Sequence, residues 1–452
     1  MNDDRGYELV VHGNLVLPGG RVLRGGWMGI SDGRIMSLSE TPLTGGDTVD
    51  AAERLILPGF VDAHVHTRSS VDEGITATTR AAAAGGTTTI IDMPFDKPDR
   101  PVNTADRFRA KVADVNAEAV VDVALYATFP ATGDLGVLAE MASAGAAGFK
   151  VSTIEVDPVR FPRIPDGRFH EAFQEIAGTG RPVAAHQENQ EIVFSQTDAF
   201  RARGDSAPID HALSRPPVAE AEAASRLLEF AYWTGAHLHM VHGTLPRTFD
   251  LIAWNRSQGV TATGETCLQY LLLTMEALRD FGGRMKCNPP LRSQDAVNGL
   301  WTQLQDGTID IVTSDHSPYP LHRKETPDIF DAFAGMPGAE TLGPLLYSAG
   351  VSTGRIDLAR FLELVASGPA DVFGLDRKGR LAPGADADFV VFDPDARWTV
   401  EDARTHYAVE WTPYHGHEVQ GRVCSTWLGG RRVYDEGVVT GQPGDGHFVR
   451  PA

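Results

Sequence analysis

The sequence predicts an α/β protein: a (β/α)8 TIM-like barrel with a small β-sandwich domain formed from both chain ends. In the middle of the chain, eight apolar strand-like runs alternate with helical patterns, which is typical of parallel α/β folds. At both ends, short alternating strands are joined by Gly-containing turns. A count of eight favours a closed barrel over an open sheet.

The eight predicted strands cover residues 55–66, 87–94, 121–129, 147–153, 182–186, 237–243, 260–267 and 309–315. Helical patterns lie between them, for example over 103–118 and over 217–234, where Pro217 suits the first helical turn. We expect residues 1–54 and 380–452 to pair into one small β domain and residues 55–379 to form the catalytic barrel.

Composition excludes several classes of partner. The net charge is −20 and no run of Lys or Arg is present, so nucleic acid is not an expected partner. Cys267, Cys287 and Cys424 lie far apart without a C-x-x-C pair, which argues against a disulfide framework or a structural zinc knuckle. The acidic N-terminus lacks a signal-peptide layout, and no apolar run approaches bilayer length. We therefore expect a cytoplasmic protein with no membrane partner.

The first predicted strand ends in two histidines, in the sequence LPGFVDAHVH. Because side chains alternate along a strand, His64 and His66 should share one face, about 6–7 Å apart at Cα. Neutral imidazoles are common ligands of zinc and related ions, and barrel active sites lie at the carboxyl ends of strands. On this motif alone, two strand-end histidines bonded to backbone remain an alternative.

Four further strand ends carry residues of the same type. Lys150 lies on the fourth predicted strand, and His186, His242 and Asp315 end the fifth, sixth and eighth. Each alone has a structural explanation: a core histidine, a helix cap or a snorkelling lysine. Together, in barrel order, they indicate an active site that binds metal.

The sixth strand leaves a choice of ligand. Alternation puts His237 and His239 on one face with Val241, and His242 on the other. We favour His242 because it comes last, before a Gly-Thr turn, and His239 stays as the alternative ligand.

Lys150 needs chemical modification before it can bind a metal. An ammonium group has three donors and no lone pair. Reaction of its nitrogen with CO₂ would give an anionic carbamate able to bridge two metal ions, chemistry that one lysine does not establish by itself.

Many segments, in order and nearly end to end, resemble the cyclic amidohydrolases of the amidohydrolase superfamily: hydantoinases, allantoinases, dihydropyrimidinases and dihydroorotases. They include LPGFVDAHVH, AAAAGGTTTIIDMP, GAAGFK, AAHQEN, MVHGT, ETCLQYLLLT, KCNPPLR, TSDHSP and MPGAETLGPLLYS. The resemblance implies two divalent metal ions, usually Zn²⁺ with Mn²⁺ or Co²⁺ as alternatives, and a homo-oligomer, a tetramer or a dimer. It implies His64, His66 and Asp315 on the first metal, His186 and His242 on the second, and N6-carboxylysine at Lys150 bridging both.

The resemblance also implies a reaction, the ring opening of a small-molecule cyclic amide or ureide. A metal-bridging hydroxide attacks the ring carbonyl, and Asp315 carries its proton to the leaving ring nitrogen. The expected substrate is allantoin or a 5-substituted hydantoin, and the product is an N-carbamoyl or ureido acid.

Departures from the family pattern narrow the substrate. Glu155 replaces the tyrosine that hydantoinases and dihydropyrimidinases commonly carry five residues after the bridging lysine. Arg68 matches a dihydroorotase arginine, but Phe95 and Tyr319 replace two other residues of that pattern. Arg68 is a candidate for a substrate carboxylate or ureido oxygen, with a surface ion pair as the alternative. Asn288, in KCNPPLR, is a candidate for contacting the ring, with loop solvation as the alternative.

Other functions stay as alternatives: dihydropyrimidinase or dihydroorotase-type activity, a non-catalytic dihydropyrimidinase-like scaffold, or a mononuclear deaminase. Presence of all six candidate ligand positions argues against a scaffold, and the bridging lysine argues against a mononuclear site.

Overall fold

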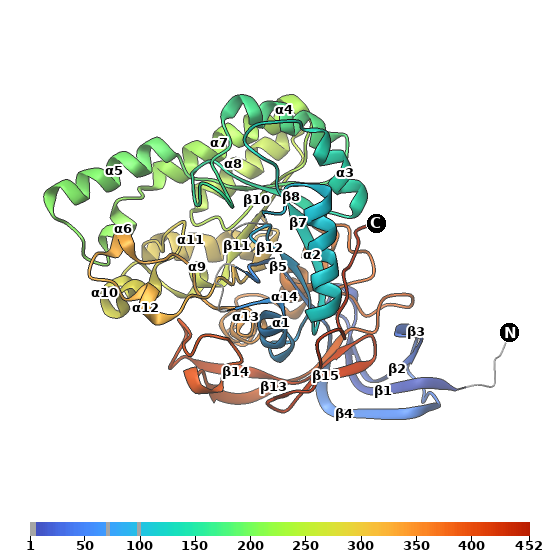
Figure 1. Ribbon diagram of the computed structural model, residues 1–452. Helices are drawn as coiled ribbons and strands as arrows, with labels where there is room; N and C mark the ends of the chain where they lie inside the picture. Colours follow the sequence, from blue (N-terminus) through green and yellow to red (C-terminus); the bar gives the residue numbers. More distant parts are fainter. Residues whose placement is uncertain (1–5, 69–72, 97–100) are drawn as a thin grey trace.

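The computed structural model describes residues 6–68, 73–96 and 101–452. It contains two eight-stranded sheets, one parallel and one mixed (Figure 1). The parallel sheet follows sequence order from β5 to β12, and a bridge between Val65 and His316 brings its two edges together. The expected barrel with a β domain built from both chain ends is confirmed.

Each of the eight predicted runs contains one barrel strand. The strands are β5 Phe60–Val65, β6 Thr87–Asp92, β7 Asp122–Ala127, β8 Gly148–Ser152, β9 Val183–His186, β10 Leu238–Met240, β11 Ala262–Cys267 and β12 Ile311–Thr313. The strands are shorter than the apolar runs because several runs continue into the loops that build the site.

The expectation of one strand over residues 55–66 is wrong in its first part. Strand β4, Gly45–Pro58, belongs to the mixed sheet, where Leu55 pairs with Phe392 and Pro58 with Phe389. The chain changes sheets at Gly59, where an added Cβ would lie 2.1 Å from Thr88 Oγ1. Glycine is the residue that permits such a close approach between backbone and neighbour.

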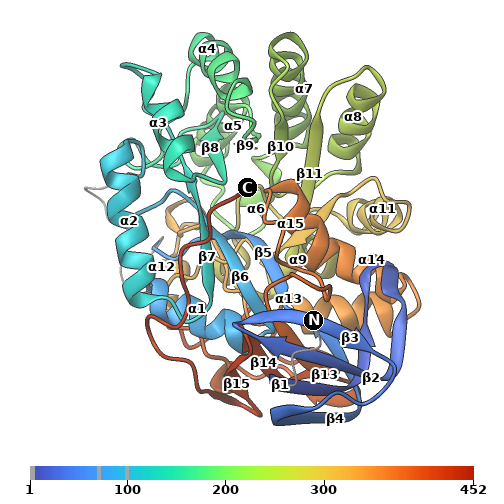
Figure 2. The same ribbon diagram turned by 90° about the vertical axis from the view of Figure 1, so that its right-hand side faces the viewer.

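Helices surround the barrel strands, as Figure 2 shows. Those of eight residues or more are α1 Ile75–Ala84, α2 Ala105–Glu118, α3 Gly136–Ala144, α4 Asp166–Ala177, α5 Gln190–Arg203, α7 Pro217–Thr234, α8 Pro246–Ser257 and α11 Gln294–Gln305. The shorter ones are α6 Asp210–Leu213, α9 Leu268–Leu272, α10 Ala277–Phe281, α12 Leu321–Lys324, α13 Leu342–Leu346, α14 Leu358–Leu362 and α15 Gly368–Val372. Helices α2 and α7 confirm the two expected helices, and Pro217 opens α7.

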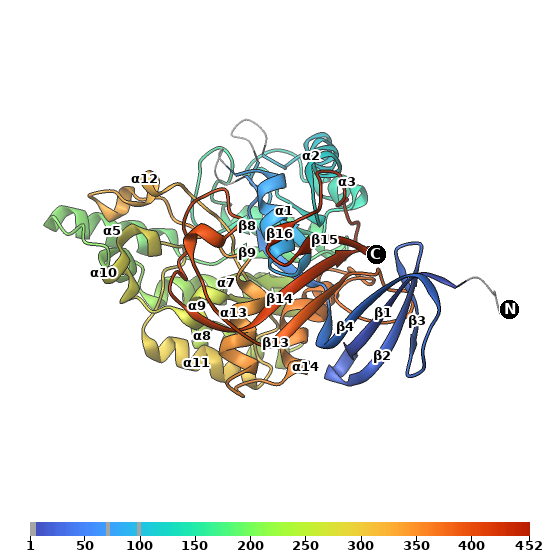
Figure 3. The same ribbon diagram turned by 90° about the horizontal axis from the view of Figure 1, so that it is seen from below.

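The mixed sheet joins the two ends of the chain (Figure 3). Its strand order is β16-β15-β14-β13-β4-β1-β2-β3, and the antiparallel β4–β13 pair links the N-terminal strands to the C-terminal ones. The further strands are β1 Tyr7–Val16, β2 Val22–Ser31, β3 Arg34–Ser39, β13 Phe389–Thr399, β14 Glu418–Leu428, β15 Arg431–Asp435 and β16 Val438–Val439.

The barrel interior is a packed core rather than a channel. Inward-facing apolar side chains form one cluster with Phe373 and Leu375, while outward-facing ones pack against the helices in a separate cluster. The interior cluster includes Val61, Ala63, Ile91, Ala124, Ala184, Val241 and Ile311. The candidate metal ligands lie at the carboxyl ends of the strands, beyond this apolar cluster. Within residues 6–68, 73–96 and 101–452, no helix is long and apolar enough to cross a membrane.

Candidate active site

All six candidate metal ligands meet at the carboxyl ends of the barrel strands. They line one cavity of about 350 Å³, which is shared by His64, His66, Lys150, His186, His242 and Asp315. The strands thus bring together residues separated by more than two hundred positions, as the barrel hypothesis requires.

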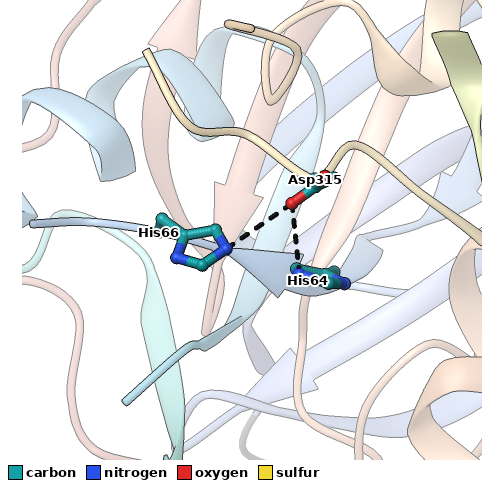
Figure 4. A group of neighbouring side chains, drawn as sticks. All are labelled: His64, His66 and Asp315. Carbon is teal, nitrogen blue, oxygen red and sulfur yellow. Dashed lines mark ion pairs between the residues drawn. The ribbon is translucent and has the colours of Figure 1, made fainter. Parts of the chain in front are cut away.

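His64, His66 and Asp315 form the tightest group (Figure 4). Asp315 Oδ1 lies 3.1 Å from His64 Nε2 and 3.5 Å from His66 Nε2. Burial would raise the pKa of Asp315, but the neighbouring His64 and His66 hold it below its usual value. Asp315 is therefore a carboxylate at neutral pH, the form that accepts protons and binds cations.

His242 reaches the site because the chain leaves the strand before it. Strand β10 ends at Met240, and His242 adopts a left-handed backbone with φ of 39°. Its ring centroid lies 4.5 Å from that of His186 and 5.4 Å from that of His64. His239, the alternative ligand, is absent from the cavity lining, and both of its ring nitrogens have protein partners.

Lys150 extends from β8 into the same cavity. Its side chain is buried, and burial lowers its pKa to about 8. A substantial fraction is then a neutral amine slightly above neutral pH, and the neutral amine is the form that can react with CO₂.

The donor set fits divalent metal ions. Three buried ring nitrogens, His64 Nε2, His66 Nδ1 and His242 Nδ1, have no hydrogen-bond partner among the described residues. Burial lowers the pKa of His66, His186 and His242, so these rings are neutral at pH 7. Neutral imidazole with carboxylate oxygen is a donor set that suits zinc and its neighbours.

Glu265 is a site residue that the sequence did not reveal. It is fully buried within β11, before the strand ends at Cys267, and its Oε1 accepts from His64 Nδ1 and from the backbone N–H of His242 at 3.1 Å. Burial would raise its pKa, but His64 and His239 hold it far below the usual range. The only signal in the sequence was a glutamate within the seventh predicted strand, in the family-like segment ETCLQYLLLT.

A second buried carboxylate supports His186. Glu188 Oε2 lies 2.9 Å from His186 Nε2 and accepts from Arg215 Nη1 at 2.6 Å. Burial would raise the pKa of Glu188, but Arg215 and His186 lower it to about 2. Glu188 remains ionised and orients the His186 ring.

Arg68 does not line the cavity. Its guanidinium donates to Asp96 at 2.9 Å, to Asp114 at 2.7 Å and to Glu118 at 3.1 Å. Two of these acids belong to α2, so the arginine fastens the end of β5 to that helix. The side chain is buried in this ion-pair group, so it does not form the surface pair considered as its alternative role.

Other side chains form the cavity wall. Arg160 stacks over the Phe95 ring, with 5.2 Å from its guanidinium carbon to the ring centroid. Asn288 also lines the cavity, and its buried Oδ1 has no hydrogen-bond partner among the described residues. Glu155 is exposed at the rim. The remaining wall is largely aromatic and includes Phe161, Tyr319, Phe330 and Phe333.

A parallel barrel with histidine, lysine and aspartate at its strand ends defines the class of metal-dependent barrel hydrolases. The chain belongs to the amidohydrolase family, whose model matches residues 55–433. It is 38% identical to the allantoinase of Rubrobacter xylanophilus over 97% of this chain and 98% of that protein. It is 36% identical to a D-hydantoinase of Rhizobium radiobacter over 93% of this chain and 94% of that protein.

A solved structure shows the same architecture. The L-hydantoinase (dihydropyrimidinase) from Arthrobacter aurescens matches with a TM-score of 0.94 at 31% identity, covering 98% of this chain and 100% of that one. The fold and these relatives together make the protein a hydrolase of C–N bonds in cyclic amides.

Proposed function

We propose that the protein opens the ring of a small five-membered cyclic ureide, allantoin or a 5-substituted hydantoin, with the help of two divalent metal ions. One observation carries this proposal: four histidines, a lysine and an aspartate converge on one cavity, with buried ring nitrogens that have no hydrogen-bond partner among the described residues. Similarity to allantoinases and hydantoinases supports the choice of ring.

The six residues divide into two metal sites in this proposal. His64, His66 and Asp315 would hold the first ion, which their mutual distances support. His186 and His242 would hold the second, and Lys150, as N6-carboxylysine, would bridge both. When bound, two such ions, Zn²⁺ or alternatively Mn²⁺ or Co²⁺, supply Lewis acidity toward a carbonyl oxygen and lower the pKa of water.

Asp315 transfers the proton in this reaction, first as a general base and then as a general acid. Its lowered pKa keeps it ionised, so it can accept a proton from the attacking water. It then donates that proton to the ring nitrogen as the C–N bond breaks, which avoids an anionic leaving group. Asn288 Oδ1, which has no partner among the described residues, would accept a hydrogen bond from a ring N–H. The product is an N-carbamoyl or ureido acid.

The cellular location, oligomeric state and domain organisation of the enzyme are further parts of the proposal. We propose a cytoplasmic homo-oligomer, a tetramer or a dimer, supported by the composition and by the family resemblance. We also propose that residues 1–54 with 380–452 and residues 55–379 act as two structural units, the second carrying the chemistry.

A ring-opening assay tests the substrate class. The metal-loaded protein would be compared on allantoin, on hydantoins with apolar and acidic substituents, on dihydrouracil and on dihydroorotate. We expect five-membered ureides to be opened fastest, and apolar substituents to be preferred over acidic ones because the wall is largely aromatic and its arginines, Arg160 and Arg215, are already paired. Faster opening of dihydrouracil or dihydroorotate would contradict the proposed ring size.

A further inference from the structure

A row of hydrogen-bonded side chains runs from His64 away from the cavity, between strands β10 and β11. Glu265 Oε1 is bonded to His64 Nδ1, and Glu265 Oε2 lies 3.2 Å from His239 Nε2. His239 Nδ1 lies 2.8 Å from Thr263 Oγ1, which in turn lies 2.9 Å from His237 Nε2. Glu265 and His239 are fully buried, so this part of the row consists of polar side chains surrounded by the apolar core.

With a neutral His239 ring, the chemistry of these groups fixes the direction of every hydrogen bond in the row. A carboxylate can only accept, so His64 must carry its proton on Nδ1 and His239 must carry its proton on Nε2. The Nδ1 atom of His239 is then a lone pair, and it accepts from the Thr263 hydroxyl. The Thr263 oxygen accepts from His237 Nε2–H. All bonds from His237 to Glu265 therefore point the same way.

We propose that Glu265 and His239, supported by Thr263 and His237, form a positioning relay that holds His64 in the Nδ1–H tautomer, with its Nε2 lone pair facing Asp315 and a metal ion. This inference rests on the proposed function, because it assigns His64 to a metal site. Carboxylates bonded to the second nitrogen of a ligating histidine fix the ring orientation and raise its basicity.

Glu265 serves both halves of the site. Its Oε1 accepts from the His64 ring and from the backbone N–H of His242, the residue that turns out of β10 with positive φ. One carboxylate thus orients a candidate ligand of each metal ion. His239 donates to the other oxygen, Oε2, and this hydrogen bond fixes the rotation of the carboxylate.

Removal of His239 would leave Glu265 Oε2 without its donor in a place that water does not reach. A buried carboxylate oxygen without a donor is unfavourable, so the carboxylate would rotate toward another donor and release His64. The Nδ1–H tautomer would then no longer be enforced. His239 acts at a distance from the cavity, which makes it a positioning residue and not a ligand.

Metal affinity tests the relay without any substrate. His239→Phe keeps a planar ring but removes both nitrogens, whereas His239→Gln keeps a donor toward Glu265 and an acceptor toward Thr263. Thr263→Val removes the hydroxyl from the row. Thr89→Val is the matched control, because Thr89 is a buried barrel threonine whose hydroxyl has no hydrogen-bond partner among the described residues.

Metal content and affinity of the four variants would be measured by chelator competition, together with thermal unfolding of the metal-free proteins. We expect His239→Phe to weaken the binding of metal about 10–100-fold. We expect Thr263→Val to weaken it less, His239→Gln to recover most of the affinity, and Thr89→Val to match the wild type.

Two results would overturn the relay. One is His239→Phe binding both metal ions as tightly as Thr89→Val. The other is equal loss of affinity in His239→Phe and His239→Gln with a parallel fall in the unfolding temperature of the metal-free protein, which indicates packing alone. Wild-type protein that binds no divalent metal would instead contradict the proposed function, so the two failures are distinguishable.

Discussion

Asp315 and His242 share an uncommon backbone at the edge of the site. Both adopt positive φ, 46° and 39°, although neither is glycine. Such conformations cost about 1–3 kcal/mol each and concentrate at functional sites. Here they turn both side chains out of the strand alternation and toward His64. The packing of the surrounding barrel therefore holds these two residues in a backbone conformation that they would not adopt by themselves.

Asp315→Asn should retain metal but lose most of its turnover. The amide keeps an oxygen that can act as a ligand, but it cannot accept and return a proton. We expect kcat to fall about 10²–10⁴-fold, the usual contribution of a positioned acid–base group. The measurement is kcat on a hydantoin alongside metal content, with the exposed Asp250→Asn as the control. Wild-type turnover in Asp315→Asn would exclude Asp315 as the base.

The six candidate ligands could be predicted from the sequence because strand periodicity is visible in short segments and because barrel active sites lie at the carboxyl ends of strands. Each lies within two residues of the end of its barrel strand, and barrel closure brings those ends together. Glu265 and the true surroundings of Arg68 were missed for a shared reason. Their partners lie far along the chain, 201 positions away for the His64–Glu265 bond and 50 for the Arg68–Glu118 bond. The spacing of residues within one strand or helix does not show which distant residues will form such pairs.

At the scale of elements, two buried lysines hold one wall of the cavity. Lys286 Nζ donates to the carbonyls of Ile329, Phe330 and Ala332. Lys324 Nζ donates to those of Lys286, Phe333 and Gly335 at 2.7–2.8 Å. Residues 329–335 have little regular structure, so these side-chain bonds replace the backbone ladder that a strand would provide.

Lys324→Met should therefore destabilise the protein strongly. Three buried carbonyls would lose their donor, and each unsatisfied group costs about 1–3 kcal/mol. We expect a loss of about 3 kcal/mol or more in the free energy of unfolding, and a raised KM because residues 330 and 332–335 line the cavity. Denaturant unfolding checks the first effect, with the exposed neighbour His322→Gln as the control. A change below 1 kcal/mol would contradict this role of Lys324.

At the scale of the whole molecule, one lysine joins the barrel to the mixed sheet. Lys378 Nζ lies 2.6 Å from Asp122 of β7, 2.9 Å from Asp386 and 2.7 Å from Asp388, just before β13. The three acids alone have the spacing of a cation site, and the ammonium group of Lys378 occupies it. These carboxylates raise the pKa of Lys378 above its usual value, despite its burial.

Lys378→Met should weaken the contact between the barrel and the mixed sheet and lower the free energy of unfolding. Removal of one partner from a buried ion-pair group leaves uncompensated charges, at a cost of about 3–5 kcal/mol. The adjacent Arg377→Met removes an arginine that is 54% exposed and pairs with Asp386, and this change should cost no more than about 1 kcal/mol. Calorimetric unfolding of both variants compares the effects. Equal stability of the two variants would contradict the importance of this contact.

The pairing of the chain ends was predictable only in outline. Alternating apolar residues at both ends indicated one β domain, but no local pattern shows that β4 pairs with β13, or that Leu55 to Pro58 belongs to the mixed sheet. Periodicity gives the strand and its buried face. The choice of neighbour depends on packing between segments more than three hundred residues apart, which a single sequence does not encode locally.

Two metal ions bound through Lys150 and the strand-end histidines are the central claim, and metal content measured together with ring opening tests it most directly. We predict close to two equivalents of zinc, manganese or cobalt per chain, loss of hydantoin or allantoin opening after chelation, and recovery when metal returns. Lys150→Ala should lose both the second equivalent and the activity. Full ring opening by metal-free protein, or full activity of Lys150→Ala, would contradict the account.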